Sequence, residues 1–144
     1  MAEEIWSGTY ESVPLNTQET SSQLVDGRAI DAFAHAIQSF NPVHMDGEWA
    51  RANTHYPDRI AHGVMTTALM SQPIVQFCER WKIRTALVST SSKYIGPVVA
   101  GDTVTTTIRL VEKTDARKRM RFTVEAKNQR GELVMVGEAL EQAL

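Results

Sequence analysis

The sequence is short of cysteine, of long apolar runs and of any excess of charge, and each shortage excludes a class of protein. A single cysteine, Cys78, excludes an internal disulfide framework and suits a reducing compartment. The longest apolar runs are far too short to span a bilayer, and the acidic N-terminal residues lack the apolar segment of a signal peptide. A formal net charge of -2 gives no indication of binding to nucleic acid or to an acidic membrane surface. We therefore expect a cytoplasmic protein with neither a nucleic-acid nor a membrane partner.

The chain does have the size and the apolar content of one domain. Its 144 residues are 42% hydrophobic, which is enough to bury one substantial core. No repeat, low-complexity tract or linker suggests a second domain, so we expect one domain over residues 1–144. The four histidines lack the spacing of metal ligands, and we expect neither a metal nor a cofactor.

The first half of the chain carries mainly helical signals. Residues 17–24 are rich in Thr and Ser and predict a strand. Apolar residues then recur at helical spacing over residues 30–37, and Asp26 is a plausible N-cap for that helix. A longer and more apolar helix is predicted from about residue 60 to residue 81, where Pro73 should kink or divide it.

The second half of the chain carries strand signals. Alternating apolar residues and turn-forming breaks predict strands over residues 86–95, 103–110, 119–126 and 133–140, which we expect to form an antiparallel meander. A further short strand is expected near residues 9–13. The long apolar helix needs a surface to bury against, so the pattern predicts an α+β fold in which a curled antiparallel sheet wraps the helix. Such a sheet leaves an edge open, so dimerisation through that edge is expected.

One stretch, residues 39–71, suggests a site. Proline fixes its own φ and keeps Asn41 out of helical geometry, so the chain should turn at Asn41-Pro42 and aim His44 in a defined direction. Gly63 begins the long helix and can expose its backbone N–H at an end that carries partial positive charge. An oriented imidazole and an exposed N–H are half of an acyl-group active site.

Four short motifs, taken in order, resemble the MaoC-like hydratase family, which includes the (R)-specific enoyl-CoA hydratases and has the hot-dog fold. They are Asn41-Pro42-Val43-His44, Ile60-Ala61-His62-Gly63-Val64-Met65, Gly96-Pro97-Val98-Val99-Ala100-Gly101-Asp102-Thr103 and Asn128-Gln129-Arg130-Gly131-Glu132. The resemblance extends from about residue 18 to residue 139. It implies a hot-dog dimer that binds acyl-CoA or acyl-carrier thioesters. It also implies that His44 is the catalytic histidine and that the N–H of Gly63 helps to hold the thioester oxygen.

The resemblance implies a set of substrate-contacting residues as well. Ser71 matches a serine of the central helix that lies close to the catalytic pair in enoyl-CoA hydratases, and Tyr94 would lie on a strand near the acyl pocket. With the residues that flank His44 and Gly63, the expected substrate-binding set is Ser71, Asn41, Val64, Met65 and Tyr94.

The sequence departs from the family motif at Ser39. The motif runs Asp-x-Asn-Pro-x-His, and its aspartate acts with the histidine, whereas a serine hydroxyl only orients a water or shares a hydrogen bond. Asp46 is one candidate replacement, because its side chain leaves on the same face as His44 if the chain there is extended, although a helix cap is the simpler role. His62 is either a second imidazole in the pocket or a structural hydrogen-bonding residue at the start of the helix.

Three functions remain open from the sequence. The first is a lyase, a hydratase or dehydratase of acyl thioesters in which His44 acts with a rearranged partner. The second is a thioester-binding subunit with little or no activity, which pairs with a homologue that carries the aspartate. The third is a thioesterase, which ranks last because the long helix offers no carboxylate before Glu79. A homodimer is the expected assembly, with a heteromer as the alternative.

Overall fold

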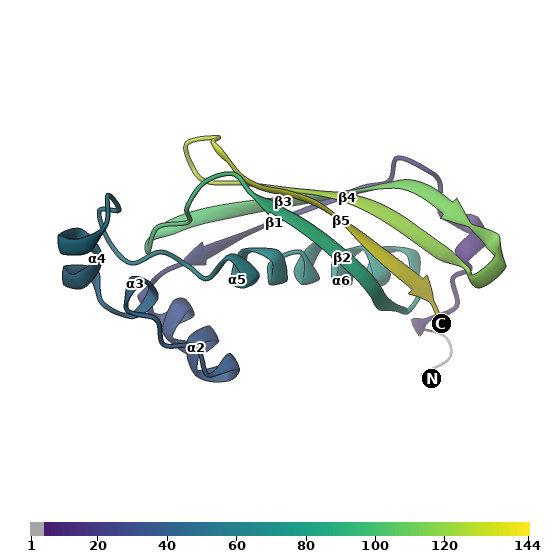
Figure 1. The fold of residues 1–144 in the computed structure, drawn as a ribbon. Coiled ribbons are helices and arrows are strands. Elements are labelled where there is room, and N and C mark those ends of the chain that lie inside the picture. The colour runs from purple at the N-terminus through teal and green to yellow at the C-terminus, as the bar shows by residue number, and fades with distance from the viewer. Residues whose placement is uncertain (1–4) are drawn as a thin grey trace.

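The computed structural model describes residues 5–144, and its chief feature is one antiparallel sheet curled around two helices that lie end to end (Figure 1). In chain order the elements are η1 (Tyr10–Ser12), β1 (Gln18–Val25), α2 (Gly27–Ile37), α3 (Pro42–Met45), α4 (Gly47–Asn53), α5 (Gly63–Ala68), α6 (Ser71–Trp81), β2 (Thr85–Tyr94), β3 (Asp102–Thr114), η2 (Asp115–Arg117), β4 (Arg119–Lys127) and β5 (Leu133–Ala143). The α+β class, with a central helix inside a curled sheet, is confirmed.

The five strands are ordered β1-β3-β4-β5-β2, and every neighbouring pair is antiparallel. Side chains of β3 and β4 alternate between buried and partly exposed, as the sequence pattern predicts for a sheet with one face on the core. The buried face meets the helices, where the rings of Phe77 on α6 and Phe122 on β4 make an edge-to-face contact with centroids 5.0 Å apart. The core therefore lies between the sheet and α5–α6.

The predicted four-stranded meander is correct only for β3, β4 and β5. β2 pairs with β5 instead of its successor β3, and thus forms the edge opposite β1. The link from β2 to β3, residues 95–101, is no tight hairpin, and Val99 within it makes an isolated bridge to Ile60. The short strand expected at residues 9–13 is a 3-10 turn, in which the N–H of Val13 donates to the carbonyl of Tyr10.

The predicted helices are confirmed, with one division. The side chain of Asp26 accepts a hydrogen bond from the N–H of Ala29 and caps α2 as expected. The long apolar helix is split at residues 69–70 into α5 and α6, within one turn of Pro73. A proline cannot donate to the carbonyl four residues earlier, so a break at this point follows from its chemistry.

The corner at Asn41-Pro42 is followed by a helical turn, not by extended chain. Pro42 opens α3, and the side chain of Asn41 accepts from the N–H of Val43 at 3.2 Å. Proline is favoured at the first position of a helix, where its missing N–H would have no partner anyway. Figure 1 shows α2, α3 and α4 gathered at one end of the molecule, at the end opposite the C-terminus. Among the described residues, no helix has the length and apolar content needed to cross a membrane.

Candidate active site

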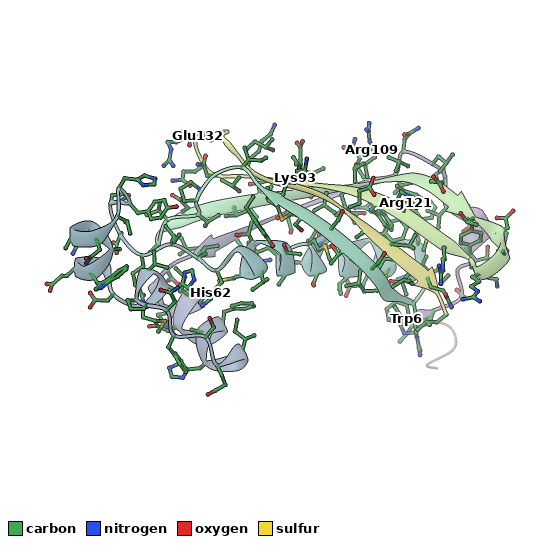
Figure 2. All side chains as sticks on the ribbon, viewed as in Figure 1. Trp6, His62, Lys93, Arg109, Arg121 and Glu132 are labelled. Atoms are coloured by element: carbon green, nitrogen blue, oxygen red, sulfur yellow. The ribbon has the colours of Figure 1, made fainter. Side chains whose placement is uncertain are left out.

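A cavity of about 450 Å³ lies where the short helices meet the start of α5 and the end of β2. Its lining comes from three parts of the chain: His44, His55, Tyr56, Ile60 and Ala61 from the helical end, Gly63 and Thr66 from α5, and residues 94–98 from β2 and the loop after it. A hollow of similar size at the other end of the molecule, beside Trp6, contains no histidine (Figure 2). Of the predicted site residues, the cavity brings together His44, Gly63 and Tyr94.

The backbone around His44 is fixed by its N-cap. The N–H of His44 donates to the carbonyl of Asn41 at 2.9 Å, and the side chain of Asn41 closes the first turn of α3. Asn41 is itself exposed and does not line the cavity. Its observed contacts therefore support a role in holding His44, while the predicted contact between Asn41 and substrate stays a prediction.

The ring of His44 is held in one tautomer. Its Nδ1 lies 2.8 Å from the carbonyl oxygen of Ile60. Because a carbonyl oxygen only accepts, Nδ1 carries the proton and Nε2 keeps its lone pair. Burial lowers the pKa of His44, and the nearby His62 lowers it further, against the opposing effect of the Ile60 carbonyl. A neutral imidazole with an unprotonated Nε2 is the form that a general base needs.

His62 supports His44 from one side. The two rings stack with centroids 3.9 Å apart, and Phe33 lies on His62 at 5.5 Å. The Nε2–H of His62 donates to the backbone carbonyl of Ser39 at 3.1 Å, while its Nδ1 has no partner among the described residues. His62 is 3% exposed and does not line the cavity, so these contacts favour the structural role that the sequence left open.

Gly63 and the ring of Tyr94 lie next to each other in the cavity wall. A Cβ on Gly63 would be 3.2 Å from the ring carbons of Tyr94, a tight contact that would require the ring to shift by a few tenths of an ångström. The Gly63 N–H, at the first position of α5, makes no hydrogen bond to another described residue. Tyr94 is held in place because its hydroxyl shares a 2.7 Å hydrogen bond with Thr67, one turn further along α5. The cavity wall here is thus an unpaired backbone donor beside an aromatic ring.

No carboxylate lines the cavity formed by the described residues. Ser39, at the position of the motif aspartate, is half-buried and contributes its carbonyl to His62. The condition for a catalytic Asp46, an extended chain after His44, is not met, because His44 lies in a helical turn and Asp46 is the N-cap of the next helix. Its side chain accepts from the N–H of Trp49 at 3.1 Å, which is the simpler capping role that the sequence also suggested.

Three further predicted residues lie outside the cavity. Met65 is buried in the core, where it packs among residues that face the sheet. Val64 is exposed on α5, and Ser71 is exposed at the start of α6. Contacts between these residues and a substrate remain predictions that the isolated chain does not support.

Sequence reasoning missed His55, Tyr56 and Thr66. The first two belong to the loop after α4, which carries no periodic signal and reaches the cavity only through the tertiary fold. The one local signal for Thr66 was its spacing. It lies three residues after Gly63 and therefore shares the face of α5 on which the cavity lies.

Comparison with known proteins defines the class of protein. The family model described as "MaoC like domain" matches residues 12–131, so the chain belongs to the MaoC-like family. It is 26% identical to the (R)-specific enoyl-CoA hydratase of Aeromonas caviae, over 90% of this chain and 95% of that protein. It is also 26% identical to fatty acid synthase 2 of Mycosarcoma maydis over 92% of this chain, which spans 4% of that synthase.

Solved structures confirm the hot-dog fold. The (R)-hydratase from Aeromonas caviae involved in PHA biosynthesis superposes with a TM-score of 0.84 at 25% identity, covering 92% of this chain and 98% of that one. The ChsH1–ChsH2 complex from Mycobacterium tuberculosis matches with a TM-score of 0.78 at 19% identity, covering 92% of this chain and 99% of that one, and therefore shows the fold alone. The chain is thus a MaoC-like hot-dog protein, from the family of acyl-thioester hydratases and dehydratases.

Proposed function

We propose that this protein adds water to the double bond of a 2-enoyl thioester, and catalyses the reverse dehydration, with His44 as the general base. The single observation that carries the proposal is the 2.8 Å hydrogen bond from Nδ1 of His44 to the carbonyl of Ile60. It leaves an unprotonated Nε2 on a ring that lines the same cavity as Gly63. Base and oxyanion donor are thereby available to one substrate.

The reaction follows from these two groups. Nε2 of His44 takes a proton from water as the oxygen bonds to the β-carbon of the enoyl group. The electrons of the double bond move toward the thioester carbonyl, whose oxygen gains negative charge. We propose that the N–H of Gly63, at the first position of α5, donates to that oxygen, and such a donor typically contributes about 10²–10³-fold in rate.

The cavity suits the acyl end of such a substrate. Its wall combines the Tyr94 ring with apolar residues of the loop after β2, including Ile95 and Val98. A volume of about 450 Å³ is within the range of ordinary small-molecule pockets. The acyl group of a CoA or carrier-protein thioester is therefore the substrate class that we propose, and a buried unpaired Cys78 supports a reducing, cytoplasmic location.

A second candidate function rests on the missing carboxylate. Ser39 replaces the motif aspartate, so the chain could bind a thioester while a homologous partner supplies the reactive pair. The matched ChsH1–ChsH2 structure is a complex of two different chains, which makes a heteromer a reasonable second proposal. The two functions differ in one observable, turnover by the purified chain on its own.

We also propose a homodimer formed through β2. This strand is an edge, pairs only with β5, and has most of its side chains exposed. Leu87 and Val88 on this strand, and Ile95 directly after it, add exposed apolar area. A long exposed edge strand is a ready surface for pairing with another chain. A dimeric mass in solution is expected, and Leu87→Asp should shift it toward the monomer without unfolding an already exposed position.

Direct assay tests the main proposal. Purified protein and His44→Ala are incubated with crotonyl-CoA and with longer 2-enoyl-CoAs, and loss of the conjugated double bond is followed by absorbance. We expect turnover by the natural protein and a large loss with His44→Ala. No turnover by the natural protein, together with thioester binding that His44→Ala leaves unchanged, would favour the binding-subunit function instead.

A further inference from the structure

The proposed hydration needs a second proton-transfer group, because a proton must reach the α-carbon as well as leave the water. In the family motif a carboxylate accompanies the histidine, but Ser39 stands at that position here. Nor does any aspartate or glutamate of residues 5–144 line the cavity. Within this chain, the candidates for the second group are the other side chains of the cavity wall.

Besides His44, three titratable side chains of the described chain line the cavity: His55, Tyr56 and Tyr94. The Tyr94 hydroxyl is engaged by Thr67. Phenols ordinarily titrate near pH 10, so a tyrosine is a poor proton donor and acceptor near neutrality. An imidazole is the side chain that gives and takes protons in that range, which leaves His55 as the suitable group.

His55 is held in a defined place although it lies in a loop. The hydroxyl of Thr54 donates to the carbonyl of Ala50 at 2.6 Å and accepts from the N–H of Tyr56 at 3.0 Å. These two bonds fix the backbone on both sides of His55 at the end of α4. Its ring contacts the Tyr56 ring at a tilt of 43°, with centroids 4.3 Å apart. Neither ring nitrogen of His55 is hydrogen-bonded to another described residue, so both are available to a substrate or water.

We propose that His55 is a catalytic residue that protonates the α-carbon, taking the part that the motif aspartate cannot play here. The inference rests on the proposed hydratase function. His44 removes a proton from water, and the oxygen bonds to the β-carbon. The resulting enolate returns its electrons to the α-carbon, which takes a proton from the His55 imidazolium. His44 ends protonated and His55 neutral, and exchange with solvent restores both. In dehydration the same two rings act in the opposite sense.

The test compares His55→Gln with His35→Gln in the full chain, using crotonyl-CoA as the probe. His35 is the matched control, because it is an exposed histidine on α2 that does not line the cavity. We expect His55→Gln to lower kcat about 100-fold with KM within threefold of the natural value, the usual loss for a missing general acid. His35→Gln should change neither constant, and both variants should keep the natural unfolding curve.

The outcomes separate this proposal from the function on which it rests. If the natural protein hydrates crotonyl-CoA and His55→Gln keeps kcat within threefold, the role of His55 is overturned and the hydratase function stands. A rise in KM with unchanged kcat would make His55 a binding residue and also overturn the proposal. If no 2-enoyl-CoA is hydrated by the natural protein, both proposals fail together.

Discussion

The sheet-and-helix body and the helical end, residues 26–62, are held together by different forces. In the body, large apolar side chains of β3, β4 and α6 are almost completely buried, among them Ile108, Phe122 and Phe77. Few side chains of the helical end are buried, namely those of Ile30, Ala34, Ala50, Ala61 and His62. The body therefore gains its stability mainly from removing apolar area from water.

Specific polar contacts organise the helical end instead. Arg59 forms an ion pair with Asp31 on α2 at 2.6 Å and lies 3.4 Å from the carbonyl of Met45 on α3. His44 and His62 are each tied to a backbone carbonyl. Such bonds contribute little net stability each, but they fix direction. The body therefore contributes most of the folding free energy, while the helical end orients the reactive groups. Mutations in the body should mainly lower stability, and mutations in the helical end should mainly lower activity.

His44→Ala should have the largest effect, and it should lower activity with little loss of stability. Removing the base should lower kcat by about 10²–10⁴-fold. The free energy of unfolding should change by no more than about 1 kcal/mol, since the half-exposed ring loses one hydrogen bond to Ile60 and its stacking on His62. Enoyl-CoA hydration and urea unfolding measure the two quantities. If His44→Ala lowered stability as much as a core mutation does, activity and stability would not depend on separate regions.

Phe122→Ala should do the reverse. Truncating a fully buried ring in contact with Phe77 should cost about 3–5 kcal/mol of unfolding free energy. Turnover per folded molecule should stay near the natural value, because the ring lies away from the cavity. Leu24→Ala is the control, since Leu24 is exposed on β1 and its loss should cost under about 0.5 kcal/mol. A hundredfold fall in kcat for folded Phe122→Ala would show that the two regions are coupled.

Asp46→Ala should have a smaller effect on stability and activity, and its structural consequence should be confined to the helical end. It removes the cap of α4, the helix that leads into the loop of His55. We expect a cost of about 1 kcal/mol, and a severalfold loss of kcat from the looser loop. Glu48→Ala, in the same first turn but without a capping bond, is the comparison. If Asp46→Ala abolished turnover while Glu48→Ala did not, Asp46 would be a reactive carboxylate after all.

The smallest expected effect is a shift in pH dependence. As pH falls, His44 becomes protonated and can no longer act as a base, so kcat/KM should decrease. Burial lowers the pKa of His44 below its ordinary value of 6.5, and the decrease should therefore be centred below pH 6.5. A profile of kcat/KM against pH measures the midpoint. A midpoint above 6.5 would mean that the site stabilises the charged imidazole.

The sequence predicts the body well and the helical end less well, for physical reasons. The alternation of apolar and polar residues in β3 and β4 arises because one face of the sheet is buried, and it can be read directly from the sequence. β2 is exposed along most of its length and carries no such alternation, so its pairing with β5 was not predictable from neighbouring strands. Whether a strand lies at the edge of the sheet depends on the topology of the whole chain, and the local sequence pattern does not encode that topology.

Within the candidate site, the predictable residues were those with a backbone reason for their position. Gly63 is the first residue of α5, and His44 follows the Asn41-Pro42 cap of α3. Both features are local signals. The helical geometry of α3 was also available, because Asn followed by Pro is typical of an N-cap and first helical position. His55 was not, because its approach to the cavity depends on a loop anchored by Thr54.

The tautomer of His44 tests the central claim most directly. Nitrogen-15 NMR of the ring at pH 7, with His44→Gln used to assign the signals, reports which ring nitrogen carries the proton. The account predicts a neutral ring with the proton on Nδ1, bonded to the Ile60 carbonyl, and a bare Nε2. A proton on Nε2 in the neutral ring, or a fully protonated imidazolium, would contradict it.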